Sequence, residues 1–199
     1  QIDAALDRTV YDKNNVAGAS LPGTLVRSEG QAASGITDAD YAYEFAGETY
    51  NFFFTTLGRD SINGTGMGLV STVRFCPYIT CPGTLYQNTF WNGAQMVYGD
   101  SFASADDVVG HELTHGVTQY TANLFYYMQS GAINESLSDI MGEYIDQLND
   151  FRITDAPATK WKIGEDLPGY PNGIRDMSDP TLFNDADKIT SPNYRGGAY

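Results

Sequence analysis

Hydrophobic positions follow two different patterns along the chain, and the change falls near residue 100. Before it, short apolar stretches are separated by turn signals such as Leu21-Pro22-Gly23 and Ile62-Asn63-Gly64, which is typical of antiparallel strands and hairpins. Residues 89–98 predict a strand pair with a turn at Asn92-Gly93. The aromatic stretch 41–54 fits either a helix or strands packed on the core.

After residue 100 the apolar positions recur at helical spacing. One helix is predicted from about Ser104 to Tyr120, because apolar residues recur along it and acidic residues at its start complement the helix dipole. A second is predicted from about Ala132 to Leu148, where apolar residues recur every three or four positions. From Asn149 onward Pro, Gly, Asp and Asn dominate, and the pattern predicts no regular element.

The charge balance excludes one class of partner. The 199 residues include 25 acidic and 11 basic side chains, a formal net charge of −14. A field of that sign repels nucleic acid. No stretch approaches the roughly 20 apolar residues of a membrane-spanning helix, so neither nucleic acid nor membrane is an expected partner.

The two cysteines, Cys76 and Cys81, are separated by four residues, which is not the two-residue gap of redox motifs or zinc knuckles. The spacing favours a local disulfide that closes a loop, with two reduced thiols as the alternative. A disulfide would indicate an oxidising compartment and hence secretion. The start at Gln1 leads us to expect a processed chain whose signal or pro-segment has been removed.

The only two histidines lie in His-Glu-Leu-Thr-His at 111–115. On the predicted helix, His111 and His115 share one face and can bind one metal ion, while Glu112 leans over its open side. Five-residue patterns with three fixed positions do arise by chance. Here the pattern falls on an independently predicted helix and uses every histidine of the chain, which favours a metal site.

A third ligand should come from the second helix, which can fold back on the first. Glu135 and Asp139 stand one turn apart on it. Glu135 can reach the metal, and Asp139 can accept a hydrogen bond from the far nitrogen of a ligand histidine. The alternative is that both are solvated surface acids.

With these motifs the chain resembles the thermolysin family of zinc metallopeptidases. The resemblance is carried, in family order from about residue 85 to 180, by His-Glu-Leu-Thr-His-Gly-Val-Thr at 111–118, by the stretches 131–139 and 90–100, and by Ile163-Gly-Glu-Asp166 followed by 174–180. Residues 1–84 match only loosely in composition. The family implies an α+β fold, with a β-rich domain at 1–125 that ends in the zinc-binding helix and the beginning of a mainly helical domain at 126–199.

The resemblance also implies roles. His111, His115 and Glu135 would bind zinc, and Glu112 would activate the water that attacks the scissile carbonyl. Substrate would be held by residues on both sides of the cut: Tyr126 at the oxyanion, Arg175 at a carbonyl on the leaving-group side, Asn88 with its edge strand at the backbone, and Val108, Ile163 and Ile174 in the pocket for the next residue. The implied activity is that of a secreted neutral endopeptidase cutting before bulky hydrophobic residues.

Calcium is the second metal that the resemblance implies. Asp107, Glu143, Asp146 and Glu165 stand where the family places calcium ligands. Lys160 and Lys162 occupy places where thermolysin has acids of a double site, and a lysine cannot bind calcium. We therefore expect one structural calcium rather than two.

One family feature is missing from the sequence. The family uses a further histidine after the Met-Ser-Asp-Pro stretch at 177–180, but no histidine follows His115. The expectation is an incomplete or cleaved chain, with the rest of the helical domain in a separate chain and apolar surface exposed on the second helix. Two alternatives are an inactive zinc-binding fragment and another two-His-plus-Glu zinc peptidase, such as an aminopeptidase.

Overall fold

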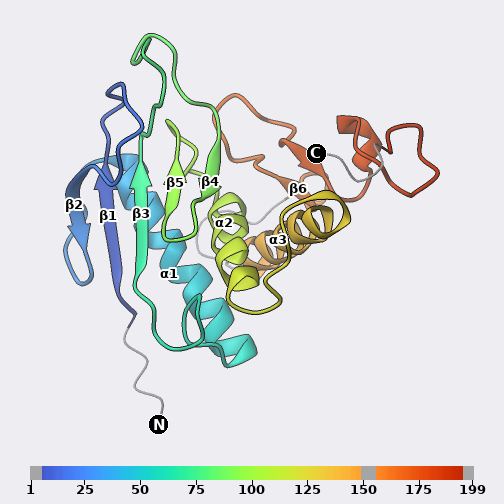
Figure 1. Cartoon of the computed structure of the whole chain (residues 1–199), viewed down its shortest axis with the longest axis horizontal. Helices are drawn as coiled ribbons and strands as arrows, with labels where there is room; N and C mark the ends of the chain where they lie inside the picture. Colours follow the sequence, from blue (N-terminus) through green and yellow to red (C-terminus); the bar gives the residue numbers. More distant parts are fainter. Residues whose placement is uncertain (1–5, 149–155, 195–199) are drawn as a thin grey trace.

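The computed structural model describes residues 6–148 and 156–194. Its N-terminal part is built on a five-stranded mixed sheet (Figure 1). Its strands lie in the order β2-β1-β3-β5-β4. Their bounds are β1 Arg8–Asp12, β2 Thr24–Ser28, β3 Leu69–Val73, β4 Thr89–Trp91 and β5 Met96–Tyr98. Strand β4 therefore forms one edge of the sheet.

The strand pairings correct part of the sequence prediction. β1 with β2 and β4 with β5 are antiparallel, as the turn signals predict. β1 with β3 and β3 with β5 are parallel, so the expectation of an antiparallel region is wrong there. Turn residues report only on the next strand along the chain, whereas parallel neighbours are joined by long crossovers. The crossover between β1 and β3 contains helix α1, Thr37–Leu57.

The aromatic stretch 41–54, for which the sequence allowed either a helix or strands, is part of helix α1. Its small and aromatic residues Ala42, Tyr43, Ala46 and Tyr50 are buried in the main core, and the helix packs across the sheet (Figure 1). Gly58 ends it in the left-handed conformation, with φ of 64°, which glycine adopts without steric cost.

Helices α2 (Asp106–Gln119) and α3 (Met128–Leu148) confirm the two predicted helices. Their backbones touch where they cross. A Cβ atom on Gly142 would lie 2.5 Å from the carbonyl oxygen of Asp107, and one on Gly110 would lie 2.9 Å from Cδ1 of Ile145. The two glycines thus bring the inner faces of the helices together.

The inner face of α3 is mostly polar or small. Its buried residues include Asn134, Ser138, Asp139 and Glu143. The expected exposure of apolar side chains on this helix is confirmed on the opposite face, at Ile133, Leu137, Tyr144 and Leu148. Ile145 is the fully buried large apolar residue of α3, so the helix is held to α2 by close backbone approach and polar contacts more than by apolar burial.

The C-terminal segment contains short elements where the sequence predicted none. β6 (Lys162–Ile163) and β7 (Arg175–Asp176) form an antiparallel pair, and η1 is a 3-10 helix at Pro180–Phe183. Elements of two to four residues are too short for periodicity to indicate. The amide of Gly164 donates to Oδ2 of Asp107 at 2.5 Å, which ties this segment to the first turn of α2.

Two further expectations concern the chain as a whole. Cys76 and Cys81 form a disulfide, as their spacing favours. None of the helices in the described ranges is long and apolar enough to cross a membrane.

Candidate active site

The three expected zinc ligands meet at one point. His111 and His115 lie one turn apart on α2, and Glu135 reaches them from the second turn of α3. The Nε2 atoms of the histidines are 2.9 Å apart, and the Glu135 carboxylate oxygens lie 3.5 Å and 3.3 Å from them. One ligand atom from each residue falls within 4.8 Å of the others.

The other ring nitrogen of each histidine faces an acceptor on α3. Nδ1 of His111 donates to the Asp139 carboxylate at 2.8 Å, and Nδ1 of His115 donates to the side-chain oxygen of Asn134 at 2.7 Å. A carboxylate and an amide oxygen accept hydrogen bonds here, so both Nδ1 atoms carry the proton. Both Nε2 lone pairs are then left to face the shared point.

This arrangement fits zinc. Two lone pairs 2.9 Å apart beside a carboxylate repel one another unless a cation lies between them. Bonds of about 2.0 Å in a tetrahedral site place ligand atoms roughly 3.3 Å apart, which is close to the observed spacing. Two nitrogens and one carboxylate are also a ligand set that leaves a fourth position for water or substrate.

Glu112 lies beside this point in a buried position. It lines the cleft and is 4% exposed. It accepts a hydrogen bond from the Trp91 backbone, whereas Oε2 has no hydrogen-bond partner among the residues described. Burial raises the pKa of Glu112 and the Glu135 charge adds to that rise, whereas protonation of either neighbouring histidine would oppose it. A buried carboxylate with one oxygen available is suited to accept a proton from a molecule in the cleft.

Tyr126 and Arg175 both line the cleft. The Tyr126 hydroxyl donates to Oε1 of Glu135. Arg175 forms a two-pronged ion pair with Asp139, with Nε to Oδ2 at 2.8 Å and Nη2 to Oδ1 at 2.5 Å. Asp139 is thus held between His111 and Arg175. Burial would raise the pKa of Asp139, but the hydrogen bond from His111 and the charge of Arg175 lower it.

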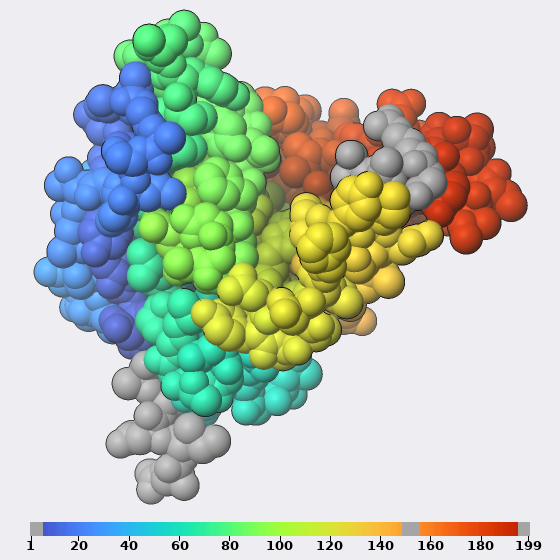
Figure 2. Space-filling view, in the orientation of Figure 1, coloured from blue at the N-terminus to red at the C-terminus, as the bar shows by residue number. Residues whose placement is uncertain are grey.

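The ligands lie on the floor of a cleft of about 720 Å³. Edge strand β4 and the residues around it, 88–93, form one wall. The surface is recessed between this green region and the yellow-to-orange segments (Figure 2). Val108, Ile163 and Ile174, which the family resemblance implies for a substrate pocket, also line the cleft. They lie on α2, on β6 and just before β7.

A second acidic cluster lies at the other side of the α2–α3 crossing. Asp107, Glu143 and Glu165 place one oxygen each within 4.8 Å of one another. Asp146 is buried one turn further along α3 but is not part of that triplet. Burial raises the pKa of Asp107 well above its ordinary value, and the charges of Asp106 and Glu143 raise it further.

Sequence reasoning missed several residues of the site. Asn134 holds His115, and Phe102 adds an aromatic wall beside Val108 in the cleft. Gln119 accepts a hydrogen bond from the Trp91 ring at 2.8 Å and so ties the end of α2 to β4. Of these residues, only Asn134 could have been found from the sequence. Its helical spacing places it on the same inner face of α3 as Gly131 and Ser138.

Two ligand histidines one turn apart, an adjoining glutamate and a third carboxylate from the next helix are the residue set of a zinc peptidase. Residues 3–119 match the family described as "Thermolysin metallopeptidase, catalytic domain". Residues 122–196 match "Thermolysin metallopeptidase, alpha-helical domain". The chain belongs to the thermolysin metallopeptidase family.

Individual relatives agree with this assignment. The chain is 41% identical to "Extracellular metalloprotease" of Pectobacterium carotovorum subsp. carotovorum, over 90% of this chain and 52% of that protein. It is 41% identical to "Bacillolysin" of Bacillus cereus, over 94% of this chain and 32% of that protein. The match therefore spans about half of these relatives' length or less.

A solved structure shares the fold. The precursor of protealysin, a metalloproteinase from Serratia proteamaculans, superposes with a TM-score of 0.74 at 40% sequence identity. The match covers 88% of this chain and 54% of that one.

Proposed function

We propose that this protein is a zinc endopeptidase that hydrolyses peptide bonds in polypeptides bound along β4. The observation that carries the proposal is the convergence of His111, His115 and Glu135 on one point beside Glu112. Both histidines are fixed by partners on α3, and the point lies on the floor of a cleft with a sheet edge as its wall.

The chemistry would be divided between the metal and the chain. When bound, zinc would act as a Lewis acid on the scissile carbonyl and on its bound water. Glu112 would accept a proton from the attacking water as its oxygen joins the carbonyl carbon. It would return that proton to the amine as the C–N bond breaks. Tyr126 would leave Glu135 to donate to the carbonyl oxygen as negative charge develops there.

Substrate would be held mainly through its backbone. The polypeptide would pair with β4 as an added strand, with Asn88 and Arg175 contacting its polar groups. The residue after the cut would enter the apolar pocket of Val108, Ile163 and Ile174, to which Phe102 contributes. Since this pocket is apolar, a large hydrophobic residue would be preferred there.

We further propose one structural calcium ion at the cluster of Asp107, Glu143 and Glu165, with Asp146 as an additional ligand nearby. Carboxylate oxygens are the ligands that calcium prefers. The boundary between the two domains would fall near residue 125, after the metal-binding helix.

We also propose that the protein is secreted, because two observations agree with an extracellular location. The Cys76–Cys81 disulfide suits an oxidising compartment, and one relative is named an extracellular metalloprotease. The expected partners are peptide and protein substrates.

The division of roles is tested by Glu112→Gln in the zinc-loaded protein. A blocked peptide with Leu or Phe after the scissile bond is the substrate, and bound zinc is counted by mass spectrometry. We expect one zinc per chain in both proteins and a loss of turnover of about 10²- to 10⁴-fold in the variant. Asp185→Asn, at an exposed acid outside the cleft, is the control and should keep full activity.

Loss of zinc from Glu112→Gln would contradict the division of roles, and retained turnover would contradict Glu112 as the base. Zinc removal by a chelator should abolish cleavage by the parent protein. One bound zinc without any cleavage would instead favour an inactive zinc-binding protein. That alternative is supported by one sequence feature: no histidine follows His115, where the family resemblance implies a further one after the stretch 177–180.

A further inference from the structure

A second hollow continues the cleft beyond Asn88. It measures about 640 Å³ and is lined by residues 78–80 and 84–88. Asn88 belongs to the linings of both cavities. The chain between Asn88 and Leu85 leads directly into β4, so a polypeptide paired with this sheet edge would run into the hollow as it passes Asn88.

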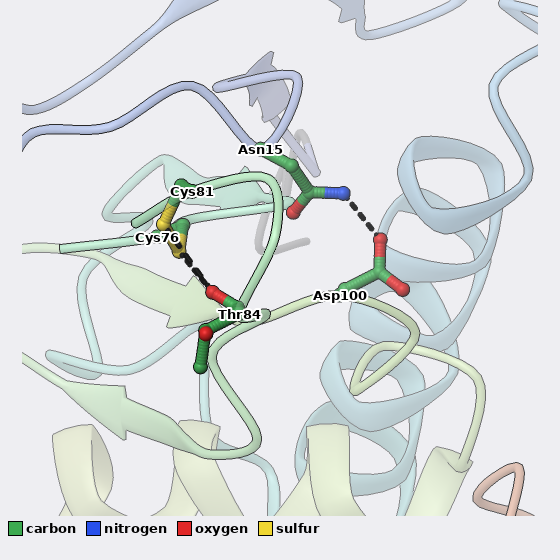
Figure 3. The surroundings of a disulfide bond; sticks show 5 residues. All are labelled: Asn15, Cys76, Cys81, Thr84 and Asp100. Atoms are coloured by element: carbon green, nitrogen blue, oxygen red, sulfur yellow. Dashed lines mark hydrogen bonds between the residues drawn. A yellow bond between two sulfur atoms is a disulfide. The ribbon is translucent and has the colours of Figure 1, made fainter. Parts of the chain in front are cut away.

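The loop that forms the hollow is held in place from three directions. The Cys76–Cys81 disulfide closes its base, and Sγ of Cys76 lies 3.2 Å from the carbonyl oxygen of Thr84 (Figure 3). The Gly18 amide donates to the Cys76 carbonyl at 3.1 Å. A Cβ atom on Gly99 would lie 1.9 Å from the Tyr86 carbonyl oxygen, so the stretch before β4 rests directly on that glycine.

The side chains of the hollow are apolar or uncharged. Tyr78 packs edge-on against Tyr86 at 5.8 Å, and Tyr86 packs against Phe90 of β4 at 6.4 Å. Ile79 is 94% exposed next to them. A single exposed isoleucine is ordinary on a protein surface. This one lines the hollow together with Tyr78 and Tyr86, and apolar and aromatic lining residues are typical of a binding pocket for an apolar side chain.

The orientation of the cleft places this hollow on the leaving-amine side. Tyr170 packs against Phe102 of the apolar pocket at 6.1 Å, and its hydroxyl donates to Oε1 of Gln87 at 3.4 Å. The pocket for the residue after the cut therefore lies toward the Asn88 end of the cleft. Residues further from the cut on that side would continue past Asn88 into the hollow.

We propose that the disulfide-closed loop forms an additional substrate-binding site, which takes a large apolar or aromatic side chain downstream of the cut. The position is roughly two to four residues after the scissile bond, since an extended strand advances about 3.3 Å per residue. This inference rests on the proposed function, because it assigns the direction of the substrate from the zinc site and its apolar pocket.

The test compares blocked peptides that share Leu after the cut and carry Phe or Ser at the second, third or fourth following position. In the zinc-loaded protein we expect kcat/KM to be about tenfold higher for Phe at one of these positions. Ile79→Ser and the pair Cys76→Ser with Cys81→Ser should reduce that Phe-to-Ser ratio toward one. Ile189→Ser, at another exposed isoleucine, should keep it.

A binding measurement separates the two proposals. The same peptides are titrated into Glu112→Gln, where the Phe peptide should bind about tenfold more tightly than the Ser peptide. Tighter binding without cleavage by the parent protein would overturn the proposed function and retain the binding site. Cleavage with equal kcat/KM at all three positions would overturn the binding site and retain the function. Self-association that depends on Ile79, without a Phe preference, would also overturn it.

Discussion

The two histidines of the proposed zinc site are both held by polar side chains of α3. Asp139 holds His111 and is itself held by Arg175, whereas Asn134 holds His115 with Ser138 3.1 Å from the same nitrogen. These partners fix which ring nitrogen carries the proton, so they decide whether Nε2 can bind a metal ion. The geometry of the site is therefore set by these four partner side chains as well as by the three candidate ligands.

Removing one of these partners should weaken metal binding without removing a ligand. We expect Asn134→Ala to reduce zinc affinity by about 10- to 100-fold, because the His115 ring loses its orientation and its proton acceptor. Competition with a chromophoric chelator measures the affinity. Asn193→Ala, outside the site, is the control. An unchanged zinc affinity in Asn134→Ala would mean that the bond from His115 does not orient the ligand.

The crossing of α2 and α3 is the element-level feature that brings the ligands together. The third ligand and both histidine partners lie on α3, and their distance from α2 is set by the contact at Gly110 and Gly142. Any group that separates the helices moves Glu135, Asn134 and Asp139 as one unit. Stability and metal affinity should consequently change together.

Gly142→Ala tests this coupling. Alanine favours a helix by about 1 kcal/mol over glycine, but its Cβ would lie 2.5 Å from the Asp107 carbonyl oxygen. We expect a net loss of about 1–3 kcal/mol in the free energy of unfolding, measured in urea, together with weaker zinc binding. Ser136→Ala, at an exposed position of α3, should change stability by less than about 0.5 kcal/mol. A more stable Gly142→Ala protein would contradict the close crossing.

The sequence predicted helices and ligands better than it predicted the sheet. α2, α3 and the shared face of His111 and His115 followed from local spacing, because helical neighbours are close in sequence. Glu135 was expected as a third ligand because a second helix follows and can fold back on the first. The parallel pairings of β1, β3 and β5 did not, since no local signal connects strands so far apart. Asn134 was not singled out for a related reason: its role is visible only when the facing helix is in place.

At the scale of the whole molecule, the acidic cluster joins three separate parts of the chain. Asp107 begins α2, Glu143 lies on α3, and Glu165 follows β6. Glu143 also accepts a hydrogen bond from the Trp161 amide at 3.0 Å. Buried acids of one sign repel, so a divalent cation at this place would stabilise the packing of both helices and the C-terminal segment.

Calcium should accordingly raise the unfolding midpoint of the protein. At a concentration 100 times the dissociation constant, the expected gain in unfolding free energy is about 2.7 kcal/mol, and magnesium should give less because it demands a smaller octahedral site. Glu143→Gln should remove most of the gain, whereas Asp185→Asn, an exposed acid outside the cluster, should retain it. Thermal unfolding with and without calcium measures this. Equal gains in both variants would contradict a site at the cluster.

The parallel pairings of the sheet also determine when its strands can assemble during protein synthesis. Arg8 pairs with Leu69, and Ser71 pairs with Met96. At a synthesis rate of about 5–20 residues per second, the first strand waits roughly 3–12 s for its central partner to be made. During that interval β2 is the one strand available to pair with β1, and the sheet is completed after the segment up to β5 has left the ribosome. Helix α2, which carries His111 and His115, follows shortly afterwards in sequence, so the floor of the cleft is synthesised just after its wall.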